Sequence, residues 1–167
     1  MDNLVVRPGR AEDLAALTDL YNHYVVHTAI TFDIEPFSIE ARADWFAHYR
    51  SDGPHRLLVA STGDTVAGYA TSSPFRQKAA YATTVETSVY CHPDWKGRGI
   101  GSALYTELFA ALAGEDVRRA CAGITLPNEA SIALHRKFGF HDVGVHTEVG
   151  RKLGQFWDVL MLERPLP

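Results

Sequence analysis

The stretch that decides the fold lies in mid-chain and reads His92-Pro93-Asp94-Trp95-Lys96-Gly97-Arg98-Gly99-Ile100-Gly101-Ser102. β-Branched residues over 83–91 predict a strand directly before it, and apolar residues at every fourth position over 100–113 predict a helix directly after it. Alternating glycines at such a junction let the backbone approach a ligand and direct several N–H groups at one point, beside the positive end of the helix. With the charges of Lys96 and Arg98, the stretch predicts a loop that binds phosphate or pyrophosphate.

Other phosphate-binding loops differ from this stretch in spacing. A Walker loop needs Gly-Lys-Ser/Thr after its second glycine, whereas Gly101 is followed by Ser102 and Ala103. A dinucleotide fingerprint that began at Gly97 would need glycine or alanine at position 102, and it normally follows an early strand. The remaining alternative is a glycine-rich turn that only joins the strand to the helix.

Working outward, the sequence predicts one α/β domain over residues 1–167. Strands are predicted at 4–7, 57–60, 66–70, 83–91, 120–125, 143–149 and 157–162, and helices at 14–25, 38–49, 100–113 and 128–138. The strands come in a run and then alternate with helices, which indicates a mixed sheet flanked by helices. The second helix is expected to be capped by the Ser38 hydroxyl and to bury Trp45, Phe46 and Tyr49.

Composition excludes several classes of protein. The 167 residues are 46% hydrophobic, enough for a sizeable core, and the net charge of −4 with scattered basic residues disfavours nucleic acid as a partner. No apolar run approaches the roughly 20 residues that cross a membrane, and the N-terminus lacks the pattern of a secretory signal. We therefore expect a cytoplasmic protein in which Cys91 and Cys121 are free thiols.

Two motifs resemble the GNAT acetyltransferase superfamily. The first is Lys96-Gly97-Arg98-Gly99-Ile100-Gly101, which is similar to the acetyl-CoA loop Gln/Arg-x-x-Gly-x-Gly/Ala except that Lys96 replaces the usual first residue. The second, about thirty residues later, runs from Asn128 to Phe140. Further segments resemble the phosphinothricin and methionine sulfoximine acetyltransferase branch over essentially the whole chain. They are Pro74-Phe75-Arg76, Thr84 to Tyr90, Leu134-His135 and Trp157-Asp158.

The resemblance implies a central, mostly antiparallel twisted sheet of about six or seven strands, flanked by helices. It implies acetyl-CoA as co-substrate, a small-molecule amine as acceptor and a homodimer. The acetyl-CoA contacts that it implies are Val89, Tyr90, Cys91, Lys96, Gly97, Arg98, Gly99, Ile100, Gly101, Ser102 and Asn128. Asn128 also suits a helix cap, a role compatible with binding.

Acetyl transfer to an amine needs a base, because a free amine is mostly protonated at neutral pH. Glu86 is the candidate, since its strand leads into the glycine loop; the alternative is a salt-bridged or edge-exposed glutamate. A backbone N–H near Val89 would polarise the carbonyl. His135 stands where many members of the superfamily have a tyrosine and would donate a hydrogen bond to the leaving thiolate; the alternative is a histidine packed on a helix face.

Several residues are candidates for the acceptor site. Arg76 would hold a substrate carboxylate through two parallel hydrogen bonds, although surface arginines are common. Phe32, Glu35 and Phe37 would close the pocket, or pack in the core, and the branch resemblance adds Thr87 and Ser88. The acceptor could instead be a protein N-terminus or a polyamine, and the chain could instead be an acyl-CoA-binding module without activity.

Two other constellations are disfavoured. His23 and His27 lie one helical turn apart, but no third ligand accompanies them in the pattern that zinc requires, so we expect no metal. Cys91 and His92 are neighbours at a strand end and point to opposite faces, so they do not form a nucleophilic dyad.

Overall fold

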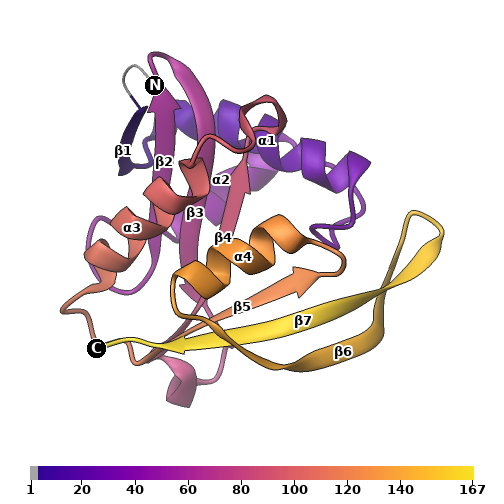
Figure 1. Cartoon of the computed structure of the whole chain (residues 1–167). Helices are drawn as coiled ribbons and strands as arrows, with labels where there is room; N and C mark the ends of the chain where they lie inside the picture. Colours follow the sequence, from indigo (N-terminus) through magenta and orange to yellow (C-terminus); the bar gives the residue numbers. More distant parts are fainter. Residues whose placement is uncertain (1–3) are drawn as a thin grey trace.

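The computed structural model describes residues 4–167, which form a seven-stranded sheet with the order β1-β2-β3-β4-β5-β7-β6 (Figure 1). The strands are β1 (Leu4–Pro8), β2 (Arg56–Thr62), β3 (Thr65–Pro74), β4 (Thr84–Cys91), β5 (Arg119–Thr125), β6 (His141–Lys152) and β7 (Gln155–Pro165). The helices are α1 (Leu14–His27), α2 (Ile39–Ala47), α3 (Ile100–Leu112) and α4 (Glu129–Lys137), with short 3-10 helices at Ala11–Asp13, Ala79–Tyr81 and Pro93–Trp95.

Neighbouring strands are antiparallel at every position of the sheet except between β4 and β5, which are parallel. That pair is short, because only Thr84, Val85 and Glu86 of β4 pair with β5. Beyond Glu86 the two strands diverge, and α4 lies over the gap between them (Figure 1). The predicted mixed, mostly antiparallel sheet is confirmed, and its centre is open where β4 leaves β5.

The two faces of the sheet carry separate cores because side chains alternate along each strand. In β2, Leu58 and Ala60 pack with α3 and the C-terminal strands, whereas Leu57 and Val59 pack with α1. The α3 stripe is fully buried, with its members Ile100, Leu104, Leu108 and Leu112 between 0% and 3% exposed. The helices α1 and α2 therefore cover one face, and α3 and α4 cover the other.

The predicted elements are all present, and several strands are longer than predicted. The Ser38 cap is confirmed, since its hydroxyl accepts a hydrogen bond from the Ala41 N–H at 3.1 Å. The burial expected for α2 is wrong in one respect. Trp45, Phe46 and Tyr49 are only partly buried, and the fully buried side chain of the helix is Arg42, which is 5% exposed.

Both cysteines are free thiols, as predicted. Among the helices of residues 4–167, none has both the length and the apolar character that a membrane crossing requires. The N-terminal residues 1–3, which entered the prediction that no secretory signal is present, lie outside the described part of the chain.

Candidate active site

The glycine loop joins β4 to α3 through residues in left-handed conformation. Gly97 has φ +75° and Gly99 has φ +77°, a region that glycine enters without strain. Gly99 is the N-cap of α3, and no side chain caps this end of the helix. The N–H groups of the first turn, over 100–102, are therefore left for a ligand at the positive end of the helix dipole.

Gly101 has a different reason to be glycine. A Cβ at this position would lie 2.9 Å from Cδ2 of Leu134, closer than real side chains approach. The missing side chain thus lets the start of α3 pack directly on α4. This contact makes the glycine loop and α4 the two walls of one groove.

The groove is a cavity of about 530 Å³. Its lining includes β4 residues Val89, Tyr90 and Cys91, loop residues Lys96, Gly97, Arg98, Gly99, Ile100, Gly101 and Ser102, and α4 residues Asn128, Ser131, Leu134 and Lys137. The structure therefore brings together all eleven residues predicted to contact acetyl-CoA. Lys137 was not predicted; its Nζ donates a hydrogen bond to Oγ of Ser102 at 3.0 Å, which adds a third cation beside Lys96 and Arg98.

Asn128 caps α4, and its Oδ1 accepts a hydrogen bond from the Ser131 N–H at 3.2 Å. The same residue lines both the groove and a smaller cavity of about 50 Å³ in the gap between β4 and β5. The smaller cavity is lined by Ile30, Thr87, Ser88, Val89, Tyr90, Gly123, Ile124, Thr125, Asn128, Ser131 and His135. A ligand arm that follows the groove from the glycine loop thus reaches the open edge of β4.

A third cavity, of about 310 Å³, lies on the α1–α2 face of the sheet. It is lined by Tyr21, Asp33, Phe37, Ala41, Arg42, Trp45, Tyr49, Tyr69, Thr71, Ser73, Ser88 and Tyr90. Ser88 and Tyr90 also line the smaller cavity, so the two spaces adjoin at β4. A volume of this size holds a small molecule, and the mixture of aromatic rings with a few polar groups is typical of a ligand pocket.

Glu86 lies on the strand that separates these cavities. It is half-buried and shares its face of β4 with Ser88 and Tyr90, and across the ladder it pairs with Ser73, which lines the third cavity. Burial raises the pKa of Glu86, and the charge of Arg76 opposes that shift. No ion pair of Glu86 is seen among residues 4–167, so the salt-bridged alternative does not describe this carboxylate.

His135 is buried, at 3% exposed, and both of its ring nitrogens have partners. Nδ1 lies 2.7 Å from the Ser131 carbonyl oxygen, which can only accept, so Nδ1 carries the hydrogen. Nε2 then accepts from the Tyr105 hydroxyl at 2.8 Å. Burial lowers the pKa of His135, although the bond to Ser131 opposes the shift. The geometry is that of the alternative, a neutral histidine packed on a helix face.

The predicted acceptor-site residues separate into two groups. Phe37 and Ser88 line the third cavity. Thr87 points to the opposite face of β4 from Ser88, where its hydroxyl faces Tyr105, and it lines only the smaller cavity. Phe32 packs on Gly150 of β6, because a Cβ there would lie 2.2 Å from the Phe32 ring. Glu35 is exposed, and the acid that lines the cavity is instead Asp33.

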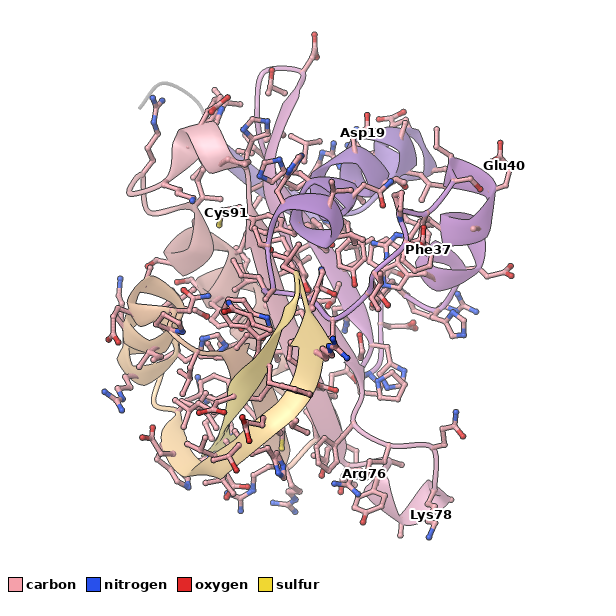
Figure 2. The ribbon with its side chains drawn as sticks, turned by 90° about the vertical axis from the view of Figure 1, so that its right-hand side faces the viewer. Asp19, Phe37, Glu40, Arg76, Lys78 and Cys91 are labelled. Carbon is pink, nitrogen blue, oxygen red and sulfur yellow. The ribbon has the colours of Figure 1, made fainter. Side chains whose placement is uncertain are left out.

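Arg76 lies in the connection between β3 and β4, at the far end of the view from Asp19 (Figure 2). It is exposed, and its guanidinium carbon lies 5.0 Å from the ring centroid of Phe75 and 5.6 Å from that of Tyr81. Its charge nevertheless acts on Glu86, because it holds the pKa of that carboxyl below the value that burial alone would give. Arg76 is thus close to the candidate base and outside the lining of the third cavity.

Arg42, Tyr21, Asp33 and Tyr49 were not predicted as site residues. A sequence signal existed for Arg42, since it precedes Trp45, Phe46 and Tyr49 by three, four and seven residues and so belongs to the same helix face. The remaining three come from α1, the loop after it and the segment just after α2. No spacing in the sequence indicates that these segments converge.

Cys91 lies in the wall of the groove, and the pair His23 and His27 lies on α1. Burial raises the pKa of Cys91 to about 11, so its thiol stays protonated at neutral pH and is no nucleophile. The rings of His23 and His27 are adjacent, with centroids 5.0 Å apart. Within residues 4–167, no group of three or more His, Cys, Asp or Glu side chains is placed to hold a metal ion.

Comparison with known proteins identifies the family of the chain. Residues 16–140 match the model of the acetyltransferase (GNAT) family. The chain is 60% identical over 163 residues to a phosphinothricin N-acetyltransferase of Streptomyces coelicolor, covering 96% of this chain and 95% of that protein. It is 33% identical over 165 residues to an L-methionine sulfoximine/L-methionine sulfone acetyltransferase of Salmonella typhimurium, covering 98% of this chain and 95% of that protein.

Among solved structures, the fold matches a phosphinothricin acetyltransferase from Sinorhizobium meliloti in complex with acetyl-CoA. The TM-score is 0.89 at 34% sequence identity, and the match covers 98% of this chain and 88% of that one. The family match spans both motifs and every strand from β2 to β5. The resemblance seen in the sequence is confirmed, and the chain belongs to the GNAT family as an N-acetyltransferase.

Proposed function

We propose that the chain transfers an acetyl group from acetyl-CoA to the amino group of a small amino-acid-like substrate, such as phosphinothricin or methionine sulfoximine, by direct attack in a ternary complex. One observation carries the proposal. The pocket on the α1–α2 face shares Tyr90 with the groove, and it shares Ser88 and Tyr90 with the smaller cavity. Glu86 lines none of these spaces but lies on the same strand, two residues before Ser88. Donor and acceptor can therefore meet without a covalent enzyme intermediate, and the protonated thiol of Cys91 offers none.

The residues of the groove suit acetyl-CoA. First-turn N–H groups of α3 and the cations Lys96, Arg98 and Lys137 would hold the phosphates, with Lys96 as a point charge where the family pattern has a planar side chain. Asn128 and the open edge of β4 would hold the pantetheine arm. When bound, acetyl-CoA supplies an activated acetyl thioester. A backbone N–H near Val89 would polarise its carbonyl.

Glu86 would accept a proton from the acceptor ammonium group, directly or through a water. Its raised pKa supports this role, because a base works best when its pKa approaches the working pH. His135 supports the wall of the smaller cavity, and its bonds to Ser131 and Tyr105 leave no ring hydrogen directed at a leaving thiolate. The thiolate of coenzyme A can leave unassisted, since a thiol has a pKa of about 8.5.

The acceptor would bind with its carboxylate near Arg76 and its side chain in the pocket lined by Phe37 and Ser88. Arg76 is suited to this role because it lies close enough to Glu86 to influence its ionisation. The names of the curated relatives, which include phosphinothricin and methionine sulfoximine acetyltransferases, point to the same class of acceptor.

An assay of thiol release from acetyl-CoA tests the proposal. The purified chain is incubated with L-phosphinothricin, L-methionine sulfoximine, a panel of protein amino acids, spermidine and an alanine-initiated peptide. The proposal expects thiol release with the first two amino acids and little with spermidine or the peptide. Thiol release only with the peptide or with spermidine would show that the acceptor is a protein N-terminus or a polyamine instead of an amino acid. Tight binding of acetyl-CoA without thiol release in the presence of any amine would indicate a binding module.

The alternative acceptors fit the pocket less well. A polyamine is a polycation, and the pocket carries the buried cation Arg42, which would repel it. A protein N-terminus has no free carboxylate beside its amino group, so Arg76 would have no such group to hold. A small zwitterionic acceptor meets neither objection.

We also propose a homodimer, as the family resemblance implies. The outer strand β6 and its partner β7 expose large apolar side chains: Val143, Val145, Val149 and Phe156 are between 48% and 60% exposed. Apolar groups in such density on adjacent strands suit an interface. Size-exclusion chromatography with light scattering should give twice the mass of 18.5 kDa, and a monomer at micromolar concentration would contradict the proposal. A cytoplasmic location stays a prediction.

A further inference from the structure

The third cavity contains a buried cation that lacks counter-charge. Arg42 is 5% exposed and lines the cavity from α2. Its Nε and Nη2 atoms are buried without a hydrogen-bond partner, and they are the only such side-chain atoms among residues 4–167. No ion pair of Arg42 is seen in the same range. A buried charge normally has a partner, because leaving it unpaired costs free energy.

Aromatic rings hold the guanidinium in place. Its central carbon lies 3.6 Å from the ring centroid of Trp45, 4.3 Å from that of Tyr21 and 5.7 Å from that of Phe37. Stacking on ring faces stabilises a cation and fixes its plane, yet it uses none of the N–H donors. Nε and Nη2 themselves have almost no accessible surface, so an acceptor that enters the cavity would reach them after a shift of the surrounding side chains.

The unpaired donors match one kind of ligand. Nε–H and Nη2–H share one edge of the planar guanidinium, and this edge pairs with two oxygens of a carboxylate, phosphinate or phosphonate. The hydroxyl groups of Ser73 and Ser88 line the same cavity, and the Tyr49 hydroxyl is 2.9 Å from Oγ of Ser73. A site of one buried arginine among hydroxyl groups favours an oxygen-rich group over a plain hydrocarbon chain.

The other charge of the cavity is already engaged. Asp33 accepts a hydrogen bond from the Tyr21 hydroxyl, and burial together with that bond raises the pKa of Tyr21 to about 12, so this hydroxyl stays protonated and donates. Asp33 thus has a donor, whereas Arg42 lacks an acceptor. An incoming acceptor group would supply the hydrogen-bond partner that Arg42 lacks.

We infer that Arg42 is a specificity-determining residue that binds the oxygen-bearing end of the acceptor's side chain, at the opposite end of the substrate from the amino group that Glu86 deprotonates. The inference rests on the proposed function and adds to it the residue that selects L-amino acids whose side chains carry a phosphinate, sulfoximine or similar oxygen-rich group. An amino acid of equal length that ends in a methyl group would leave the guanidinium unpaired and bind poorly.

The test compares two substrates in three proteins. The ratio kcat/KM is measured for L-phosphinothricin and for L-norleucine with the wild type, Arg42→Met and Arg42→Lys. We expect Arg42→Met to lower kcat/KM for phosphinothricin by about 10- to 100-fold, the effect of a hydrogen bond to a charged group, through KM. In the same variant we expect kcat/KM for norleucine to change by less than about threefold. Arg42→Lys should keep part of the activity on phosphinothricin that Arg42→Met loses.

Controls separate specificity from folding. Arg10→Met removes an arginine that is 62% exposed and lies outside the site. It should leave kcat/KM unchanged for both substrates. Thermal melting and acetyl-CoA affinity report whether Arg42→Met is folded. If Arg42→Met is not folded, the comparison of the two substrates is made with Arg42→Lys. A loss of equal size for phosphinothricin and norleucine in folded Arg42 variants would overturn the inference, while a wild type that acetylates no amino acid would overturn the proposed function.

Discussion

The Tyr105 hydroxyl lies 2.8 Å from Nε2 of His135 and donates to it inside the core. Both side chains are at most 3% exposed, and burial raises the pKa of Tyr105 while it lowers that of His135. The pair is therefore a neutral hydrogen bond between two packed elements, α3 and α4. This relationship places His135 in the wall of the site, with neither ring nitrogen presenting a hydrogen to a leaving thiolate.

The first prediction follows from that pair. His135→Ala should lower the free energy of unfolding by about 1–3 kcal/mol, because the Tyr105 hydroxyl loses its acceptor. It should change kcat by less than about fivefold in the folded protein, well below the 10²–10⁴-fold of a lost general acid. Urea unfolding and steady-state kinetics measure the two effects. A fall of 100-fold in kcat at unchanged stability would show that His135 donates a proton after all.

The second prediction concerns Glu86. Glu86→Gln keeps the shape of the side chain and removes the base, so kcat should fall by about 10²–10⁴-fold. The affinity for acetyl-CoA, measured by calorimetry, should stay within about twofold, since the groove residues are untouched. Thr84→Ser, on the same face of β4 and two residues earlier, is the matched control. Wild-type turnover in Glu86→Gln would remove this residue from the mechanism.

The third prediction uses the charge of Arg76. Burial raises the pKa of Glu86 and Arg76 opposes the shift, so Arg76→Gln should raise that pKa further. A base is active when deprotonated, and the acidic limb of the kcat/KM profile should therefore move to higher pH. The KM for the amino acid should rise about 10-fold if the guanidinium also binds its carboxylate. Because Arg76 is exposed, salt screens its charge, and the difference in pH between the acidic limbs of wild type and variant should be smaller in high salt. Arg76→Lys keeps the charge and should have the acidic limb of the wild type.

Much of the fold follows from the sequence because its signals are local. The α3 stripe at every fourth residue, the Ser38 cap and the β-branched run over 84–91 each predict an element that the structure contains. The groove was predictable for the same reason, since the glycine loop is one continuous segment. Its third cation, Lys137, was not, because it reaches Ser102 from a helix that begins 27 residues later in the chain.

The third cavity, which is the proposed acceptor pocket, was largely beyond sequence analysis. Its walls come from α1, the following loop, α2, β3 and β4, and no periodicity shows that these segments meet. Arg42 illustrates the difficulty. Arginine is usually exposed to solvent, so the sequence predicts an exposed side chain, whereas three aromatic rings surround its guanidinium in the structure. Thr87 was expected at the acceptor site together with Ser88. Neighbours on a strand face opposite sides, so Ser88 lines the third cavity and Thr87 lines the smaller one.

The fourth prediction tests the glycine loop. Gly99→Ala places a Cβ at φ +77°, which costs about 1–2 kcal/mol in that conformation. The loop should relax away from it, and the acetyl-CoA Kd should rise about 5- to 30-fold as the first-turn N–H groups move. Gly53→Ala is the matched control, because it meets the same penalty at φ +76° in a turn before β2. Both variants should melt at lower temperature, and only Gly99→Ala should weaken acetyl-CoA binding; an equal effect on binding would count against the loop.

The fifth prediction concerns Lys137, whose Nζ donates to Oγ of Ser102 at the N-terminus of α3. If this ammonium also attracts a phosphate of acetyl-CoA, Lys137→Met should raise the Kd about 2- to 5-fold at low salt, as expected for an exposed charge-assisted contact. The difference should narrow as salt is added, because added ions screen an exposed charge. Arg136→Met is the control on the neighbouring residue, whose guanidinium pairs with Asp142 at 3.0 Å. Calorimetric titrations at two salt concentrations measure the effect. A Kd for Lys137→Met equal to the wild-type value at low salt would show that Lys137 does not bind a phosphate, and Lys96, Arg98 and the N-terminus of α3 would then be the remaining candidates.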